Sequence, residues 1–139
     1  MKIKYSLINV MLGACVGFAS LVASAQSMKV TLSGSQEVPP VMTSASGVGS
    51  IVVGSDGSVS GTITTTGVEG TMAHIHEAPM GQNGPVIVPF TKTSDSVWSA
   101  PAGAKLTDAQ LQSLKSGNLY LNVHSATNKP GEIRAQLKP

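Results

Sequence analysis

Cysteine is nearly absent from this sequence: Cys15 is the only one among 139 residues. One thiol excludes an intramolecular disulfide and any metal site that is built from several cysteines. Charged residues are also scarce, at 12%. The sequence has no cluster of Lys and Arg of the kind that would predict a nucleic-acid-binding surface. The folded part of the chain must therefore be held by a hydrophobic core, and a metal site would have to use other ligands.

Residues 1–25 have the three parts of a secretory signal peptide. Lys2 and Lys4 supply the positive start, an apolar stretch runs from about 7 to 22, and Ala23-Ser24-Ala25 is a small-x-small cleavage signature. We expect cleavage after Ala25 and a mature domain of residues 26–139. The protein would then be periplasmic or extracellular.

Two alternatives for this segment remain open. A retained membrane anchor needs about 20 unbroken apolar residues, whereas this run is shorter and contains Asn9. Leu12-Gly13-Ala14-Cys15 resembles a bacterial lipobox. The apolar run continues well past Cys15, however, so we rank anchoring through a lipid on Cys15 below simple secretion.

Cleavage would also change the charge of the protein. The loss of Lys2 and Lys4 lowers the number of basic residues from nine to seven, which equals the seven acidic residues. The net positive charge of the whole chain therefore comes from the targeting segment. We expect neither a nucleic-acid partner nor a membrane span in the mature protein.

The remaining sequence predicts an all-β sandwich or flattened barrel of about eight strands. Short apolar–polar alternations are separated by Gly, Ser, Thr and Pro, as in such folds. The strands are expected at residues 28–32, 49–53, 58–65, 71–77, 86–90, 97–99, 118–125 and 131–137. Thr107 and Gln110 form a capping-box pattern and Gly117 follows where a helix would stop, which predicts one short helix at 107–116.

The three histidines of the chain fall on two of these strands. His74 and His76 are two residues apart, so a strand would point both to the same face and Ile75 to the other. The apolar alternation in the last two strands likewise puts His124 and Arg134, the only arginine, on the faces away from the core. The pattern predicts an exposed histidine site on the outer face of the sandwich.

Three neutral imidazoles are a good donor set for copper or zinc and leave one coordination position open. Zinc hydrolysis usually needs a nearby carboxylate base, but the pleat sends Glu77 to the opposite face from His76. Copper therefore ranks above zinc. A thioether from Met72, on the same face as His74, or from Met80, in the following loop, could serve Cu(I). The alternative is that the histidines only make hydrogen bonds.

The arrangement of these motifs resembles the CHRD domain, which is named for chordin and is common in exported bacterial proteins. The resemblance covers residues 28–137. The motifs that carry it are Leu32-Ser33-Gly34-Ser35-Gln36-Glu37-Val38-Pro39-Pro40, His74-Ile75-His76, Gly81-x-Asn83-Gly84-Pro85-Val86, Asn122-Val123-His124 and Gly131-Glu132-Ile133-Arg134-x-Gln136-Leu137. It implies a single CHRD domain after the signal peptide.

The same pattern is more distantly similar to copper-zinc superoxide dismutases, which have a Greek-key β-sandwich. That resemblance implies that His74, His76 and His124 correspond to copper ligands and Arg134 to the arginine beside the copper. The bridging ligand, the zinc site and the structural disulfide of those enzymes have no counterpart, because the chain has no further histidine and no cysteine pair.

Three functions remain open from the sequence. The first is an exported protein that binds or buffers copper through His74, His76 and His124. The second is a copper-only enzyme related to superoxide dismutase, in which Arg134 attracts superoxide to the open copper position. The third is a metal-free structural or adhesive β-domain. We rank a non-enzymatic role above an enzymatic one, and the sequence identifies no protein partner.

Overall fold

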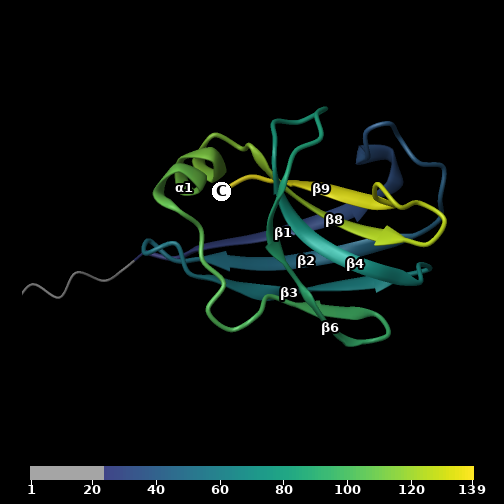
Figure 1. Cartoon of the computed structure of the whole chain (residues 1–139), viewed down its shortest axis with the longest axis horizontal. Coiled ribbons are helices and arrows are strands. Elements are labelled where there is room, and N and C mark those ends of the chain that lie inside the picture. Colours follow the sequence, from purple (N-terminus) through teal and green to yellow (C-terminus); the bar gives the residue numbers. More distant parts are fainter. Residues whose placement is uncertain (1–23) are drawn as a thin grey trace, which may run out of the picture.

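The computed structural model describes residues 24–139, which form nine strands, one α-helix and a 3-10 turn (Figure 1). Cys15 and all but the last two residues of the expected signal peptide lie outside the described residues. The elements are β1 (Gln26–Ser33), the 3-10 turn (Gly34–Gln36), β2 (Ser46–Val53), β3 (Val59–Thr66), β4 (Gly70–Glu77), β5 (Val86–Pro89), β6 (Thr91–Ser94), β7 (Val97–Ser99), α1 (Asp108–Lys115), β8 (Leu119–Ser125) and β9 (Ile133–Leu137).

All nine strands belong to one antiparallel sheet in the order β5-β4-β8-β9-β1-β2-β3-β7-β6. The two edge strands, β5 and β6, are consecutive in the chain and only Phe90 lies between them. The Phe90 amide donates to the Ala73 carbonyl at 2.9 Å, and Lys92 Nζ donates to the Gly70 carbonyl at 3.0 Å. These bonds bring β6 beside β4, so the sheet curls into a nearly closed barrel.

The barrel interior is filled by alternate side chains of the strands. Ile75, Leu121 and Ile133 are fully buried there. The interior also contains Gly49, where a Cβ atom would come within 2.6 Å of the Leu121 side chain. A small residue at this position therefore allows opposite walls of the barrel to approach each other.

The all-β fold predicted from the sequence is confirmed, with nine strands in place of about eight. The additional strand is β6, whose four residues are all exposed, so no apolar alternation reveals it. The predicted helix is confirmed: the Gln110 amide donates to Thr107 Oγ1 at 3.2 Å, and the Thr107 amide donates to Gln110 Oε1 at 2.9 Å. β2 pairs with β3, with Val53 opposite Val59.

The outer face of β8 is covered, which corrects the expectation of an exposed site. His76 and His124 are each 7% exposed and Arg134 is 1% exposed. Residues 34–45 and the 78–85 loop fold across the outer face of β8 and β9 (Figure 1). Strand alternation identifies the face to which a side chain points, but it does not reveal what lies over that face.

Candidate metal centre

The three histidines come together on the outer face of β4 and β8. Their nearest potential ligand atoms all lie within 4.8 Å of one another. The ring centroids are separated by 5.3 Å between His74 and His76, 4.9 Å between His74 and His124, and 5.8 Å between His76 and His124. The three residues therefore form a candidate metal site, on the shared face that the strand alternation predicted.

Two backbone carbonyls orient two of the rings. His76 Nδ1 donates to the Gly84 carbonyl at 2.9 Å, and His124 Nδ1 donates to the Lys129 carbonyl at 2.7 Å. A carbonyl oxygen only accepts, so each neutral ring carries its proton on Nδ1 and a lone pair on Nε2. Both rings are held in the tautomer that presents Nε2 to a metal.

His76 Nε2 is buried and has no hydrogen-bond partner among the described residues. A buried acceptor without a partner costs about 1–3 kcal/mol of stability. A metal ion bound to this atom would remove that cost. Since the other nitrogen of the ring is bonded to the covering loop, Nε2 is the atom of His76 that remains for a metal.

His74 completes the cluster through its contact with His124. His74 Nδ1 lies 3.0 Å from His124 Nε2, and because the latter atom carries a lone pair, the His74 nitrogen is the donor. A metal bound to His74 Nδ1 would displace the proton that this atom now donates to His124. His74 can carry that proton on its Nε2 atom instead. The three donors would then be Nδ1 of His74 and Nε2 of His76 and His124.

Burial favours the uncharged form of His74 and His76. Desolvation and, to a smaller extent, the neighbouring rings of His124 and His76 lower the pKa of His74 to about 4. Burial also lowers the pKa of His76, against the opposing effect of its hydrogen bond to Gly84. Neutral imidazole is the form that binds metals, so these two rings are ready for a metal at neutral pH.

Arg134 is tied to the 78–85 loop and is not exposed. Its Nη2 atom donates to the Gln82 carbonyl at 2.8 Å, and its Nη1 atom donates to Asn83 Oδ1 at 3.1 Å. Asn83 in turn donates to the Val38 carbonyl at 2.7 Å. The guanidinium group therefore fixes the loop whose next residue, Gly84, orients His76.

Tyr120 and Gly84 also belong to the site, although no sequence pattern predicted a role for them. The Tyr120 ring stacks on His76, and the Arg134 guanidinium lies 3.4 Å from the centre of the Tyr120 ring. The Tyr120 hydroxyl accepts from the Gly84 amide at 3.2 Å. A Cβ at Gly84 would collide with the Glu77 carbonyl oxygen, so this position requires glycine. The only sequence signal for the role of Tyr120 beside the histidines was that it shares a strand face with His124.

The two methionines considered as ligands lie in different places. Met72 is directly opposite His124 in the pairing of β4 with β8 and is 50% exposed. Met80 lies over the end of β9, where it lines hollows with Gln136 and Lys138. Glu77 accepts a hydrogen bond from Ser113 of α1. The structure therefore places Met72 by the histidines, and it turns Glu77 toward the helix.

These motifs occur in the order of a known family. The family model of the CHRD domain matches residues 28–137. The chain belongs to the CHRD domain family. No curated protein and no solved structure shows significant similarity to the chain. The five motifs that carried the resemblance all contribute to the site of this CHRD domain or to the loops above it.

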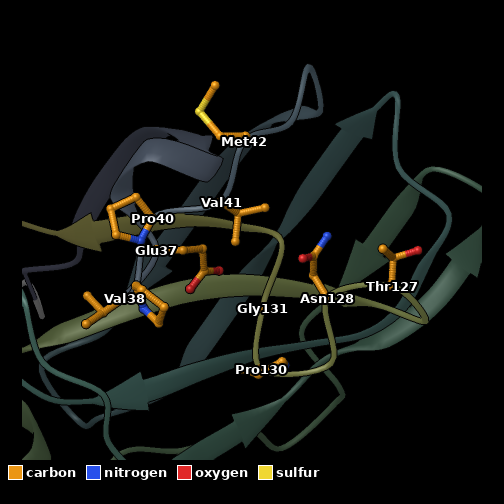
Figure 2. Close-up of a pocket in the computed structure, with 10 residues that line it drawn as sticks. Glu37, Val38, Pro40, Val41, Met42, Thr127, Asn128, Pro130 and Gly131 are labelled. Carbon is orange, nitrogen blue, oxygen red and sulfur yellow. The ribbon is translucent and has the colours of Figure 1, made fainter.

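The CHRD domain also has a hollow of about 450 Å³ between residues 37–42 and residues 127–131 (Figure 2). The Glu37 carboxyl group lies between the 38–42 segment and the 128–131 turn, and Glu37 is 5% exposed. Desolvation raises the pKa of Glu37 to about 7, against the opposing charge of Arg134. Asn122 Nδ2 is 3.4 Å from Glu37 Oε1, and Asn122 lies opposite His74. A polar contact thus links the hollow to the cluster.

In the part of the chain that the structure describes, no helix has the length and apolar character needed to cross a membrane.

Proposed function

We propose that this CHRD domain is an exported copper-binding protein whose ligands are His74, His76 and His124. The observation that carries the proposal is the buried Nε2 atom of His76, which lacks a partner and belongs to a ring that lies beside two further imidazoles. If the histidines served only as hydrogen-bonding groups, this atom would remain an uncompensated cost.

The three imidazoles can bind one copper ion after a small adjustment of their positions. Metal–nitrogen bonds of about 2.0–2.1 Å require two ligand nitrogens of one ion to lie within about 4.2 Å of each other. The candidate atoms lie within 4.8 Å of one another. A small side-chain rotation that moves one nitrogen by a few tenths of an ångström would bring all three within bonding distance of one ion. His74 is the least buried of the three and can make this adjustment.

Copper is favoured over zinc by the chemistry of the donors. The cluster consists of three imidazoles with no carboxylate, and imidazole suits copper as well as zinc. Hydrolytic zinc chemistry would need a base, and Glu77 is bonded to α1. When bound, copper would supply an ion that can be stored, transferred or cycled between Cu(I) and Cu(II).

Export is supported by the position of the first strand. β1 begins at Gln26, directly after the expected cleavage site. Removal of residues 1–25 would therefore leave every strand of the sheet intact. This relationship supports the signal peptide and a periplasmic or extracellular location.

A superoxide dismutase-like activity is the second candidate. It would use Arg134 to attract an anion, but this guanidinium is 1% exposed and is bonded to Gln82 and Asn83. These bonds favour a role in holding the loop. Binding or buffering of copper therefore stands ahead of catalysis.

The test is a metal titration of the protein purified after expression of the full chain, with its N-terminus determined by mass spectrometry. We expect an N-terminus at Gln26 and tight binding of one copper ion. His76→Ala and His124→Ala should each weaken binding about 100-fold or more, because each removes one of three ligands.

Asp95→Asn, which removes an exposed carboxylate in the β6–β7 turn, is the matched control and should bind copper like the wild type. Copper binding that survives both histidine substitutions would overturn the proposal. If copper binds as expected, loss of superoxide dismutation in Arg134→Ala with unchanged copper content would move the second candidate ahead.

A further inference from the structure

Met72 occupies the strand position beside two of the three histidines. It lies directly opposite His124 across the β4–β8 pair, and it precedes His74 by two residues on the same face. The Cβ atoms of directly opposed residues are about 4.5–5.5 Å apart, and residues two apart on a strand are separated by about 7 Å. A flexible methionine side chain can span either distance.

Regular pairing holds Met72 in this position. The register that pairs His74 with Asn122 continues without a break to Met72 opposite His124. It ends just beyond, where Thr71 is an extra residue in β4. The Thr71 hydroxyl donates to the His124 carbonyl at 3.3 Å, which fixes this bulge beside the site. Met72 is therefore the last residue of β4 that is in register with the histidines.

The other sides of the cluster are already occupied. Tyr120 stacks on His76, and the carbonyl of Lys129 holds the far side of His124. His74 is only partly buried, and Met72 is 50% exposed. The cluster is therefore most accessible at the end of the face where Met72 lies.

We propose that the Met72 thioether is a fourth ligand that makes the histidine site selective for Cu(I) over Cu(II) and Zn(II). This inference rests on the proposed three-histidine copper site. Thioether sulfur is a soft ligand that favours Cu(I), whereas imidazole binds several divalent metals. A site of three imidazoles and one thioether has no charged ligand, which suits a singly charged ion better than a doubly charged one.

The experiment compares the wild type with Met72→Leu, a substitution that conserves volume and is tolerated well. Anaerobic competition with a chromophoric Cu(I) chelator should show a Cu(I) affinity at least tenfold lower in Met72→Leu. The affinities for Cu(II) and Zn(II) should change less than twofold. Met80→Leu and Met42→Leu are matched controls and should leave all three affinities unchanged, since Met42 is fully exposed and Met80 lies over β9.

A second measurement detects the sulfur directly. In protein labelled with ¹³C at the methionine methyl groups, addition of Ag(I), a redox-inert substitute for Cu(I), should shift the Met72 methyl resonance and leave those of Met42 and Met80 in place. X-ray absorption of the Cu(I) form should show one sulfur neighbour that is lost in Met72→Leu.

The outcomes separate the two proposals. If Met72→Leu binds Cu(I) like the wild type while His76→Ala does not bind, the inference about Met72 is wrong and the three-histidine site stands. If Met72→Leu weakens all three metals equally, Met72 acts through packing and the inference is also wrong. If the wild type binds none of the metals, the proposed function itself fails.

Discussion

Tyr120 stacks face to face on His76, with ring centroids 4.8 Å apart and an angle of 6° between the ring planes. Arg134 lies 3.4 Å from the centre of the same tyrosine ring. β8 lies between β4 and β9 in the sheet, so His76 and Arg134 approach Tyr120 from opposite sides. One aromatic ring thus connects the candidate ligand with the residue that holds the covering loop.

Substitution of Tyr120 should affect stability and metal binding together. Tyr120→Leu removes the stack and the acceptor for the Gly84 amide, and we expect it to lower the free energy of unfolding by about 1–3 kcal/mol. It should also weaken copper binding about tenfold, as losses around a metal ligand do. Tyr120→Phe keeps the ring and should cost only about 1 kcal/mol. Urea unfolding and copper titration measure both effects, and equal behaviour of the two variants would contradict the role of the stack.

Arg134→Lys should destabilise the covering loop although it preserves the charge. A single ammonium group cannot reproduce the two directed bonds to the Gln82 carbonyl and Asn83. We expect a loss of about 1.5–3 kcal/mol in the free energy of unfolding, since hydrogen bonds to charged groups contribute amounts of this size. Hydrogen exchange at the Gly84 amide should become faster. Wild-type exchange at Gly84 in Arg134→Lys would show that the loop does not depend on the guanidinium group.

Gly84→Ala should disrupt the loop more than Gly81→Ala does. At Gly84 a Cβ atom would collide with the Glu77 carbonyl oxygen, whereas at Gly81 no atom lies within 4 Å and only the positive φ of 81° is unfavourable. We expect a cost of about 1 kcal/mol at Gly81 and at least about 2 kcal/mol at Gly84, because the backbone must move. Only Gly84→Ala should displace the carbonyl that orients His76 and so weaken copper binding. Thermal unfolding and copper titration of the pair provide the test.

Glu37 should make the protein less stable as the pH rises toward 7. Its pKa is about 7 in the folded protein and 4.5 ordinarily, so between these values the folded state holds a proton that the unfolded chain has lost. The free energy of unfolding therefore falls through this window and levels off above it. Arg134 is the charged group that faces Glu37 and opposes the shift.

Glu37→Gln should remove this dependence. At pH 8 we expect the variant to be more stable than the wild type by about 1–3 kcal/mol, with little difference at pH 4. The free energies of unfolding of the two proteins are measured with urea at several pH values and subtracted. His74 has the opposite effect, because its low pKa makes acid destabilising between pH 6.5 and 4. Both proteins contain His74, so its contribution cancels in the difference. A constant difference across the pH range would contradict the burial of Glu37.

The strand pattern was sufficient to predict which side chains share a face of the sheet. Period-two alternation put His74, His76 and His124 on one side, but it did not give the order of the strands in the sheet, which depends on long-range pairing. The cover over the site could not be predicted, because it depends on long-range bonds from Asn83 and Arg134 between loops. β6 was missed because its side chains are all exposed, and it is recognised only through its pairing with β7.

The single residue between β5 and β6 has a consequence for a sheet that no disulfide braces. Exposed sheet edges attract strands of other molecules and promote aggregation. Here each edge strand continues through Phe90 into the other, and the Phe90 amide is bonded to β4. A strand of another molecule would have to break the contacts between β6 and β4 before it could pair with either edge strand. The closure of the barrel at Phe90 therefore protects the two sheet edges against pairing with strands of other molecules.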